Sequence, residues 1–294
     1  LAAGGTLGIL IPPSVILIIY SILTEQNIAK MFLAAFVPGI LAAIGYLIAI
    51  AIFVRIKPDS GPPTSYVGWR QRLSLFGQVW QILVIFFLVI GGIYLGWFTP
   101  TEGASIGAAG TGIMALFTKG FNFNDLIEVI KDTAVTSAMI FLVLLGAEFF
   151  NSFIALTQIT NQLATFVITN QLSPYLVVFC ILVLYVFLGC LMDSLAMILL
   201  TIPVFFPIII ELDFGMSIEE VAIWFGILTL IVVEVGLITP PVGLNVFIIN
   251  KMAKNVPISD TFIGVLPFLI SDLIRVGILF IFPGISLFLI RLLG

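Results

Sequence analysis

The stretch best suited to chemistry is Val235-Gly236-Leu237-Ile238-Thr239-Pro240-Pro241-Val242-Gly243-Leu244-Asn245, which lies within an apolar segment over about 222–250. Two consecutive prolines remove two amide donors and clash with the preceding turn, so a helix must break there. In a membrane, broken backbone is tolerated only where it is buried in protein or lines a cavity. The freed carbonyl oxygens and the Thr239 hydroxyl can then bind a cation. The alternative is that the prolines only kink a membrane helix.

The composition indicates a polytopic membrane protein. Of 294 residues, 61% are hydrophobic and 9% are charged, with a mean hydropathy of +1.29. A soluble domain carries about 25% charged residues. The chain contains no histidine, which excludes imidazole metal sites and His-based proton relays within it. Cys180 and Cys190 lie in apolar surroundings, where packing is a simpler role than a disulfide.

A second copy of the double-proline motif lies near the start of the chain. Gly8-Ile9-Leu10-Ile11-Pro12-Pro13 aligns with Gly236–Pro241 at an offset of 228 residues (240 − 12). Pro38 and Pro267 follow the two motifs at a similar offset of 229 residues (267 − 38). The preserved spacing predicts an internal repeat, which fixes the architecture. Chance similarity between apolar helices is the alternative.

The charges predict how the repeats are oriented. The stretch 55–75 is charged and rich in proline, and the positive-inside rule places it in the cytoplasm. Tracing the spans from there puts the acidic loop 211–220 outside and makes the two broken helices run in opposite directions. Inverted repeats of this kind are the architecture of alternating-access carriers. The predicted regions are the end of a first repeat over 1–54, a cytoplasmic linker over 55–75 and a second repeat over 76–294. The basic residues placed inside are Arg55, Lys57, Arg70, Arg72, Lys119, Lys131, Lys251 and Lys254.

The segment 174–210 predicts a re-entrant helical hairpin. Its apolar run is interrupted near the middle by Gly189-Cys190-Leu191-Met192-Asp193-Ser194. One or two ordinary spans with a tolerated Asp are the alternative. The fold class is therefore an all-α polytopic membrane protein, an inverted-repeat elevator-type transporter with a re-entrant hairpin and proline-broken helices. Other expected elements are an amphipathic helix over 122–132, a span over 134–154, the broken helix over about 221–250 and a last span over about 262–282.

Polar residues within spans are functional candidates by default. Asp193, at the hairpin tip, is the best candidate for organising an ion or substrate site. Glu234 lies two residues before Gly236 and is placed to orient the unwound loop. Asp272 and Arg275 are three residues apart on one helix face and are expected to neutralise each other. The candidates for the substrate cavity are Asp193, Ser194, Glu234, Pro240, Pro241 and Asn245.

At these motifs the sequence resembles the large membrane subunit, the DctM-like M subunit, of tripartite ATP-independent periplasmic (TRAP) transporters. The resemblance follows the whole chain in order. Because the family's subunits are longer at the amino end, it implies that this chain is amino-terminally truncated. The stretches that carry it are Gly4-Gly5-Thr6-Leu7-Gly8-Ile9-Leu10-Ile11-Pro12-Pro13-Ser14, Phe98-Thr99-Pro100-Thr101-Glu102-Gly103-Ala104, Gly189–Ser194, Glu234–Asn245 and Phe282-Pro283-Gly284-Ile285-Ser286-Leu287.

The resemblance implies an elevator-type, Na⁺-coupled importer of organic acids, such as C4-dicarboxylates, sialic acid or related carboxylates, in a bacterial inner membrane. The implied partners are a periplasmic substrate-binding protein and a small four-helix membrane subunit. Na⁺ is the implied coupling ion, with no cofactor, no other metal and no nucleic acid. One sodium site is expected to lack the hairpin residues that would precede Leu1. The implied sodium sites map onto Gly8, Ile11 and Pro13 for one ion, and onto Gly189, Gly236, Thr239 and Val242 for the other.

Other classes of protein make different demands on the sequence. A stand-alone divalent-anion/Na⁺ symporter shares hairpins and broken helices but needs no binding protein, and it is the closest alternative. A proton-conducting subunit of a respiratory complex predicts rows of Lys, His or Glu within spans. A membrane-embedded enzyme needs a nucleophile, a metal or an acid–base pair, and none is grouped here. The protein is therefore expected not to be an enzyme.

Overall fold

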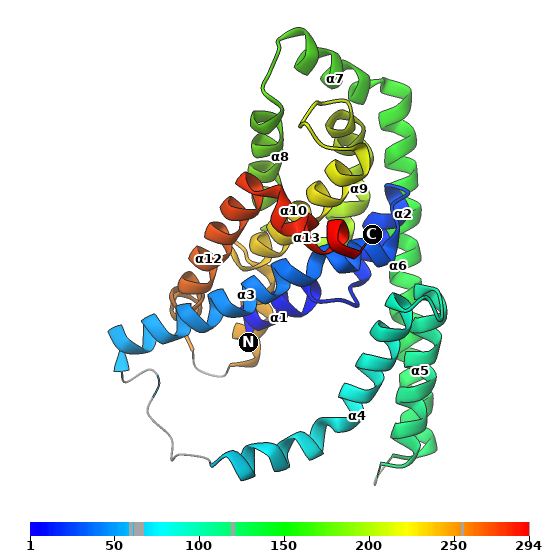
Figure 1. Ribbon diagram of the computed structural model, residues 1–294, viewed down its shortest axis with the longest axis vertical. Helices are drawn as coiled ribbons and strands as arrows, with labels where there is room; N and C mark the ends of the chain where they lie inside the picture. Colours follow the sequence, from blue (N-terminus) through cyan, green and yellow to red (C-terminus); the bar gives the residue numbers. More distant parts are fainter. Residues whose placement is uncertain (59–60, 62–67, 119–120, 254–255, 294) are drawn as a thin grey trace. The chain divides into compact units, whose positions relative to one another are not determined.

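The computed structural model describes residues 1–58, 61, 68–118, 121–253 and 256–293, and the elements that they form are all α-helices (Figure 1). In chain order they are α1 (Ala2–Leu10), α2 (Val15–Leu23), α3 (Ile28–Ile56), α4 (Trp69–Tyr94), α5 (Pro100–Leu116), α6 (Phe123–Thr157), α7 (Ile159–Thr169), α8 (Pro174–Gly189), α9 (Ser194–Ile210), α10 (Ile218–Ile238), α11 (Leu244–Met252), α12 (Ile258–Ile281) and α13 (Pro283–Leu293).

Four of these helices, α3, α6, α10 and α12, are long and apolar enough to cross a membrane. Helices α1 and α2, bent by 46° at the break between them, add a fifth span if the bent pair counts as one. The bilayer core needs about 20 apolar residues in a helix, and these helices meet that length. The expected all-α polytopic membrane protein is confirmed.

The chain divides into two compact units, which are described separately. The first unit comprises Leu1–Pro58 and Leu144–Gly294, and the second comprises Asp59–Val143. The first unit contains both double-proline breaks and both helices of the expected hairpin, α8 and α9. Every candidate site residue therefore belongs to the first unit.

Helix α10 is the core of the first unit. Every residue of α10 from Val221 to Ile238 is buried, whereas α3 and α12 each bury only some of their residues. It contacts α8, α9, α12, α3 and α1, and Figure 1 shows it among them. A helix that is apolar on all sides is stable in this central position. Two aromatic side chains join α10 to other helices, since Tyr20 of α2 donates to the Ala222 carbonyl at 2.6 Å and Trp224 of α10 donates to the Leu279 carbonyl of α12 at 2.9 Å.

The start of α10 is fixed by its cap and by two ion pairs. The Ser217 hydroxyl accepts a hydrogen bond from the Glu220 N–H at 3.2 Å, and the Glu220 carboxylate accepts one from the Ser217 N–H at 3.1 Å. This capping box satisfies two backbone donors that a helix start leaves free. Lys30 of α3 pairs with Glu219 at 2.6 Å, and Arg291 of α13 pairs with Glu220 at 2.7 Å. The first turn of α10 is thereby joined to α3 and α13.

Helices α3 and α12 pack against each other across a buried polar group. The Tyr46 hydroxyl of α3 donates to Asp272 Oδ2 of α12 at 2.7 Å. Arg275 Nη2 lies 2.9 Å from Asp272 Oδ1, which confirms the neutralising pair expected from the sequence. The hydroxyl of Thr6 in α1 lies 3.2 Å from that of Tyr46. Three apolar helices thus share one polar contact.

In the second unit, α5 packs closely on α4 through its small residues. A Cβ atom built at Gly103 would lie 3.0 Å from the Ile93 side chain, and one built at Gly107 would lie 3.3 Å from Val89. Small residues allow membrane helices to approach in this way.

Two boundaries differ from the sequence-based expectation. Helix α6 is continuous over Phe123–Thr157, where an amphipathic helix over 122–132 and a separate span over 134–154 were predicted. The predicted linker 55–75 overlaps the start of α4 at Trp69, while its residues 59–60 and 62–67 lie outside the described residues, as do Lys119 and Lys254. The division into repeats and their inverted orientation stay predictions.

Candidate functional site

The hairpin tip lies directly against the end of α10. Helix α8 ends at Gly189, residues 190–193 form the tip, and α9 begins at Ser194. A Cβ atom built at Gly236 would lie 2.6 Å from the Cα of Gly189, and one built at Gly189 would lie 3.0 Å from the Val233 carbonyl oxygen. Because neither glycine has a side chain, backbone meets backbone here. Two residues of the candidate sodium set, Gly189 and Gly236, are therefore in contact.

The predicted break is present immediately after α10. Thr239 leaves the helix with extended backbone, φ −91° and ψ 136°, and Gly243 begins α11 with φ +55°. The Pro240–Pro241 peptide bond is cis. Neither proline can donate to the carbonyl four residues before it, those of Gly236 and Leu237. The Gly236 carbonyl accepts instead from the Thr239 N–H at 3.0 Å.

The Thr239 side chain folds back on the helix. Its hydroxyl donates to the Val235 carbonyl at 2.6 Å. A hydroxyl has one donor and two lone pairs, so the oxygen keeps the capacity to bind a cation. Val242, the remaining residue of this sodium set, is half-buried in the same break, and Asn245 is half-buried in the first turn of α11.

Cys190, in the hairpin tip, contacts the double-proline break after α10. Its thiol lies 3.6 Å from the Pro240 carbonyl oxygen and also contacts the Val186 carbonyl. The sequence predictions gave Cys190 only a packing role. Its position next to Gly189 in the tip was the signal for this contact. Residues 189–190 therefore face the stretch 236–240.

Glu234 joins α10 to the second arm of the hairpin. The Ser194 hydroxyl donates to Glu234 Oε1 at 3.0 Å, and the two residues are only 4% and 3% exposed. Glu234 Oε2 is buried without a hydrogen-bond partner among the described residues. The sequence predicted that Glu234 orients the unwound loop, whereas its observed contact is with the hairpin.

Asp193 is exposed and acts as the N-cap of α9. Its Oδ2 accepts from the Leu195 N–H at 3.0 Å. An acidic N-cap satisfies a free backbone donor at the positive end of the helix. Pro240 and Pro241, the other cavity candidates, are also exposed.

The first double-proline break has a similar backbone, but the residues of its candidate sodium set are more exposed. Ile11 ends α1 with φ −80° and ψ 123°, close to the values of Thr239, and the Pro12–Pro13 bond is also cis. The Ser14 hydroxyl caps α2 by accepting from the Leu17 N–H at 3.4 Å. Gly8, Ile11 and Pro13 are exposed, and no described atom lies within 4 Å of a Cβ built at Gly8.

A buried broken helix that meets a helical tip, within an apolar polytopic chain, defines the class as a membrane protein of the secondary-transporter type. The chain belongs to the family of the tripartite ATP-independent periplasmic transporter, DctM component, whose profile matches residues 1–285. This confirms the resemblance to the DctM-like M subunit. The family consists of transporter permeases rather than enzymes, and the protein is an integral protein of the bacterial inner membrane.

Curated relatives match nearly the whole chain. The C4-dicarboxylate TRAP transporter large permease protein DctM of Pseudomonas aeruginosa is 33% identical over 291 residues, which cover 99% of this chain and 66% of the relative. The sialic acid TRAP transporter permease protein SiaT of Haemophilus influenzae is 34% identical over 298 residues, covering 99% and 46%. The sialic acid TRAP transporter large permease protein SiaM of Vibrio cholerae is 28% identical over 293 residues, covering 98% and 66%. The chain thus spans less than two thirds of the length of each.

Proposed function

We propose that the protein is the membrane subunit of a Na⁺-coupled secondary importer, a symporter, of organic acids. It works by elevator-type alternating access together with a small four-helix membrane subunit and a periplasmic substrate-binding protein. The substrate class is C4-dicarboxylates, sialic acid or related carboxylates. Two relatives named above are sialic acid permeases and one is a C4-dicarboxylate permease, which supports this class.

The contact between Gly189 and Gly236 carries the proposal. It brings a helical tip to a break where oxygen atoms are released from helical hydrogen bonding. The Leu237 carbonyl has no helical donor, because the residue four positions later is Pro241, which lacks an N–H. The Thr239 hydroxyl oxygen retains its lone pairs. Hard cations bind such oxygens. A Na⁺ ion at Gly189, Gly236, Thr239 and Val242 would hold the tip on α10, which couples ion binding to the shape of the substrate site.

The polar residues around this contact divide into two roles. Ser194 and Glu234 are buried and bonded to each other, which supports a role in holding the hairpin on α10. Asp193, Pro240 and Pro241 are exposed, which supports a role in facing the cavity, with Asn245 beside them. A second ion is assigned to Gly8, Ile11 and Pro13, where the same motif has the same extended backbone.

Uptake in proteoliposomes tests the proposal. The full-length protein, with its small subunit and its binding protein, is reconstituted and supplied with labelled C4-dicarboxylate or sialic acid. Uptake is expected only with an inward Na⁺ gradient and with the binding protein present. Uptake that needs Na⁺ but no binding protein would favour the stand-alone symporter. Uptake without any Na⁺ dependence would overturn the coupling.

The residue assignment has its own test. Thr239→Val removes the hydroxyl and is expected to shift the Na⁺ concentration for half-maximal uptake upward about tenfold, since one lost ligand costs about 1.4 kcal/mol. Thr239→Ser keeps the hydroxyl and is the matched control. Unchanged sodium dependence in both Thr239→Val and Asp193→Asn would sink the proposed site.

A further inference from the structure

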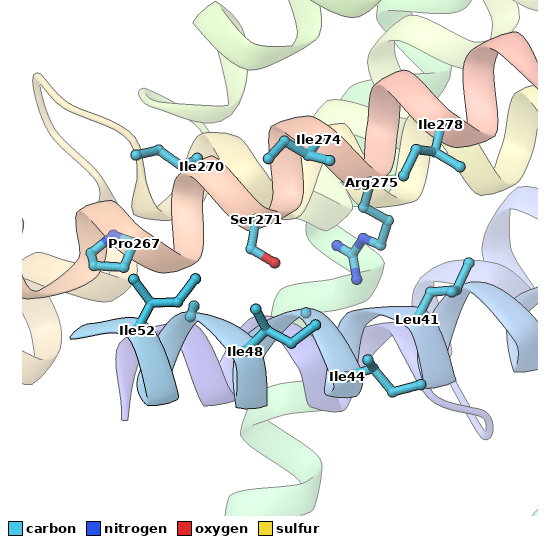
Figure 2. A pocket seen from close by; sticks show the side chains of 12 residues that line it. Leu41, Ile44, Ile48, Ile52, Pro267, Ile270, Ser271, Ile274, Arg275 and Ile278 are labelled. Carbon is cyan, nitrogen blue, oxygen red and sulfur yellow. The ribbon is translucent and has the colours of Figure 1, made fainter. Parts of the chain in front are cut away.

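An apolar groove lies between α3 and α12. It has a volume of about 340 Å³, and Figure 2 shows its two walls. Ile270, Ile274 and Ile278 form one wall, at a spacing of four residues that places them on one face of α12. Leu41, Ile44 and Ile48 of α3 form the other. Both walls are apolar and therefore complement the surface of a hydrocarbon chain.

One wall also carries a buried cation. Arg275 points from α12 toward α3 in Figure 2, and its side chain is 9% exposed. Its Nη2 is paired with Asp272, but Nε and Nη1 are buried without a hydrogen-bond partner among the described residues. A buried donor without an acceptor is costly, and hydrocarbon offers none. The groove therefore lacks an acceptor oxygen beside Arg275.

The charges around Arg275 show which kind of acceptor is missing. Asp272 neutralises the guanidinium and is itself held by the Tyr46 hydroxyl at 2.7 Å. An additional anion would leave the buried group with a net negative charge, which is unfavourable in a medium of low dielectric constant. A neutral carbonyl oxygen satisfies the two free N–H groups without that penalty.

Arg275 lies in the last third of α12. It lies six residues before the helix ends at Ile281, which is about 9 Å along the axis. Its guanidinium is directed back toward Asp272, one turn nearer the amino end of α12. A partner helix is a poorer occupant, because its own carbonyls are already used within the helix.

We propose that this groove binds one glycerolipid of the surrounding bilayer. An acyl chain lies between the isoleucines of α3 and α12, and an ester carbonyl oxygen accepts hydrogen bonds from Nε and Nη1 of Arg275. Recognition depends on the ester rather than on the headgroup, because the Arg275–Asp272 pair is neutral. Phosphatidylethanolamine and phosphatidylglycerol are therefore bound about equally.

Native mass spectrometry of the full-length protein in detergent tests this inference. The probes are ester-linked phosphatidylethanolamine and phosphatidylglycerol, and ether-linked analogues with the same headgroups and chain lengths. We expect one retained ester lipid with either headgroup, and about tenfold weaker retention of the ether lipids. Equal retention of ester and ether lipids would overturn the proposal, as would a strong preference for the anionic headgroup.

A variant locates the site. Ile274→Trp fills the groove and keeps the Arg275 side chain, whereas Leu273→Trp changes a neighbour of similar exposure that is not part of the groove lining. Retention of the ester lipid is expected to fall with Ile274→Trp and to be unchanged with Leu273→Trp. If Ile274→Trp does not fold, Ile48→Trp fills the groove from α3. Full retention in a folded groove-filling variant would contradict the assignment.

Discussion

The two double-proline breaks share a motif and a backbone conformation but differ in what covers them. Gly236, in the second break, is pressed against Gly189 of the hairpin tip, whereas a Cβ built at Gly8 meets no described atom within 4 Å. The helix before the second break is the buried core of its unit. The motif therefore sets where the chain breaks in both places, and within the described residues a helical tip faces the second break.

Helices α3 and α12, each the second helix after one of the breaks, meet at Asp272. Pro38 lies within α3 and Pro267 within α12, as the repeat predicts. Tyr46 and Arg275 occupy positions related by the same offset of 229 residues (275 − 46), and both contact Asp272. Asp272 thus receives one bond from Tyr46 of α3 and one from Arg275 of its own helix.

The largest loss of stability is expected at Asp272, where α3 and α12 are joined. Asp272→Ala leaves the buried Arg275 without its counter-charge, and breaking a buried pair costs about 3–5 kcal/mol. Glu219→Ala removes the exposed pair with Lys30 and should cost at most about 1 kcal/mol. Unfolding temperatures of the full-length protein in detergent compare the two. Similar small losses would mean that Asp272 does not hold α3 and α12 together.

The second prediction compares the hydrogen bonds made by Glu234 with those made by Thr6. The predicted repeat aligns these two positions, which are 228 residues apart. Ser194→Ala removes the donor to Glu234 Oε1 and leaves this buried oxygen without a partner, which costs about 1–3 kcal/mol. Thr6→Ala leaves the Tyr46 hydroxyl with its bond to Asp272, so the loss should be only about 0.5–1.5 kcal/mol. Chemical unfolding should rank Ser194→Ala as the more destabilised variant. The reverse order would show that Glu234 does not depend on Ser194.

The third prediction tests the contact of the tip with the break. Gly236→Ala places a methyl group 2.6 Å from the Cα of Gly189, so backbone must shift, at a cost of about 1–3 kcal/mol. Gly8→Ala has room and replaces glycine within a helix, so stability should be unchanged or slightly raised. Thermal unfolding distinguishes the two variants. A loss as large for Gly8→Ala would reveal a neighbour beyond the described residues.

Local chemistry explains what could be predicted from the sequence. Proline has no N–H, so both breaks follow from Pro12-Pro13 and Pro240-Pro241. The Asp272–Arg275 pair follows from a spacing of three on one helix face. The arms of the hairpin follow from the polar, glycine-containing tip between two apolar runs, and the observed helices α8 and α9 end and begin at Gly189 and Ser194.

Contacts between distant segments could not be predicted in the same way. No local pattern links Tyr46 to Asp272 or Ser194 to Glu234, because these contacts depend on how the helices pack. In helix α6, by contrast, the sequence indicated a boundary that the structure does not have. A change from amphipathic to apolar composition near residue 133 indicated a boundary, but no proline or glycine lies there, and the backbone stays helical.

The smallest predicted effect concerns the residue that starts the second arm of the hairpin. Asp193 caps α9, and replacing a capping residue by alanine costs about 1 kcal/mol. Asn caps a helix about as well as Asp, so Asp193→Asn should unfold at the wild-type temperature while Asp193→Ala unfolds earlier. Asp193→Asn therefore removes the charge and keeps the fold. If it also weakens Na⁺-dependent uptake, the charge acts in transport, whereas normal uptake in Asp193→Asn would reduce Asp193 to a helix cap.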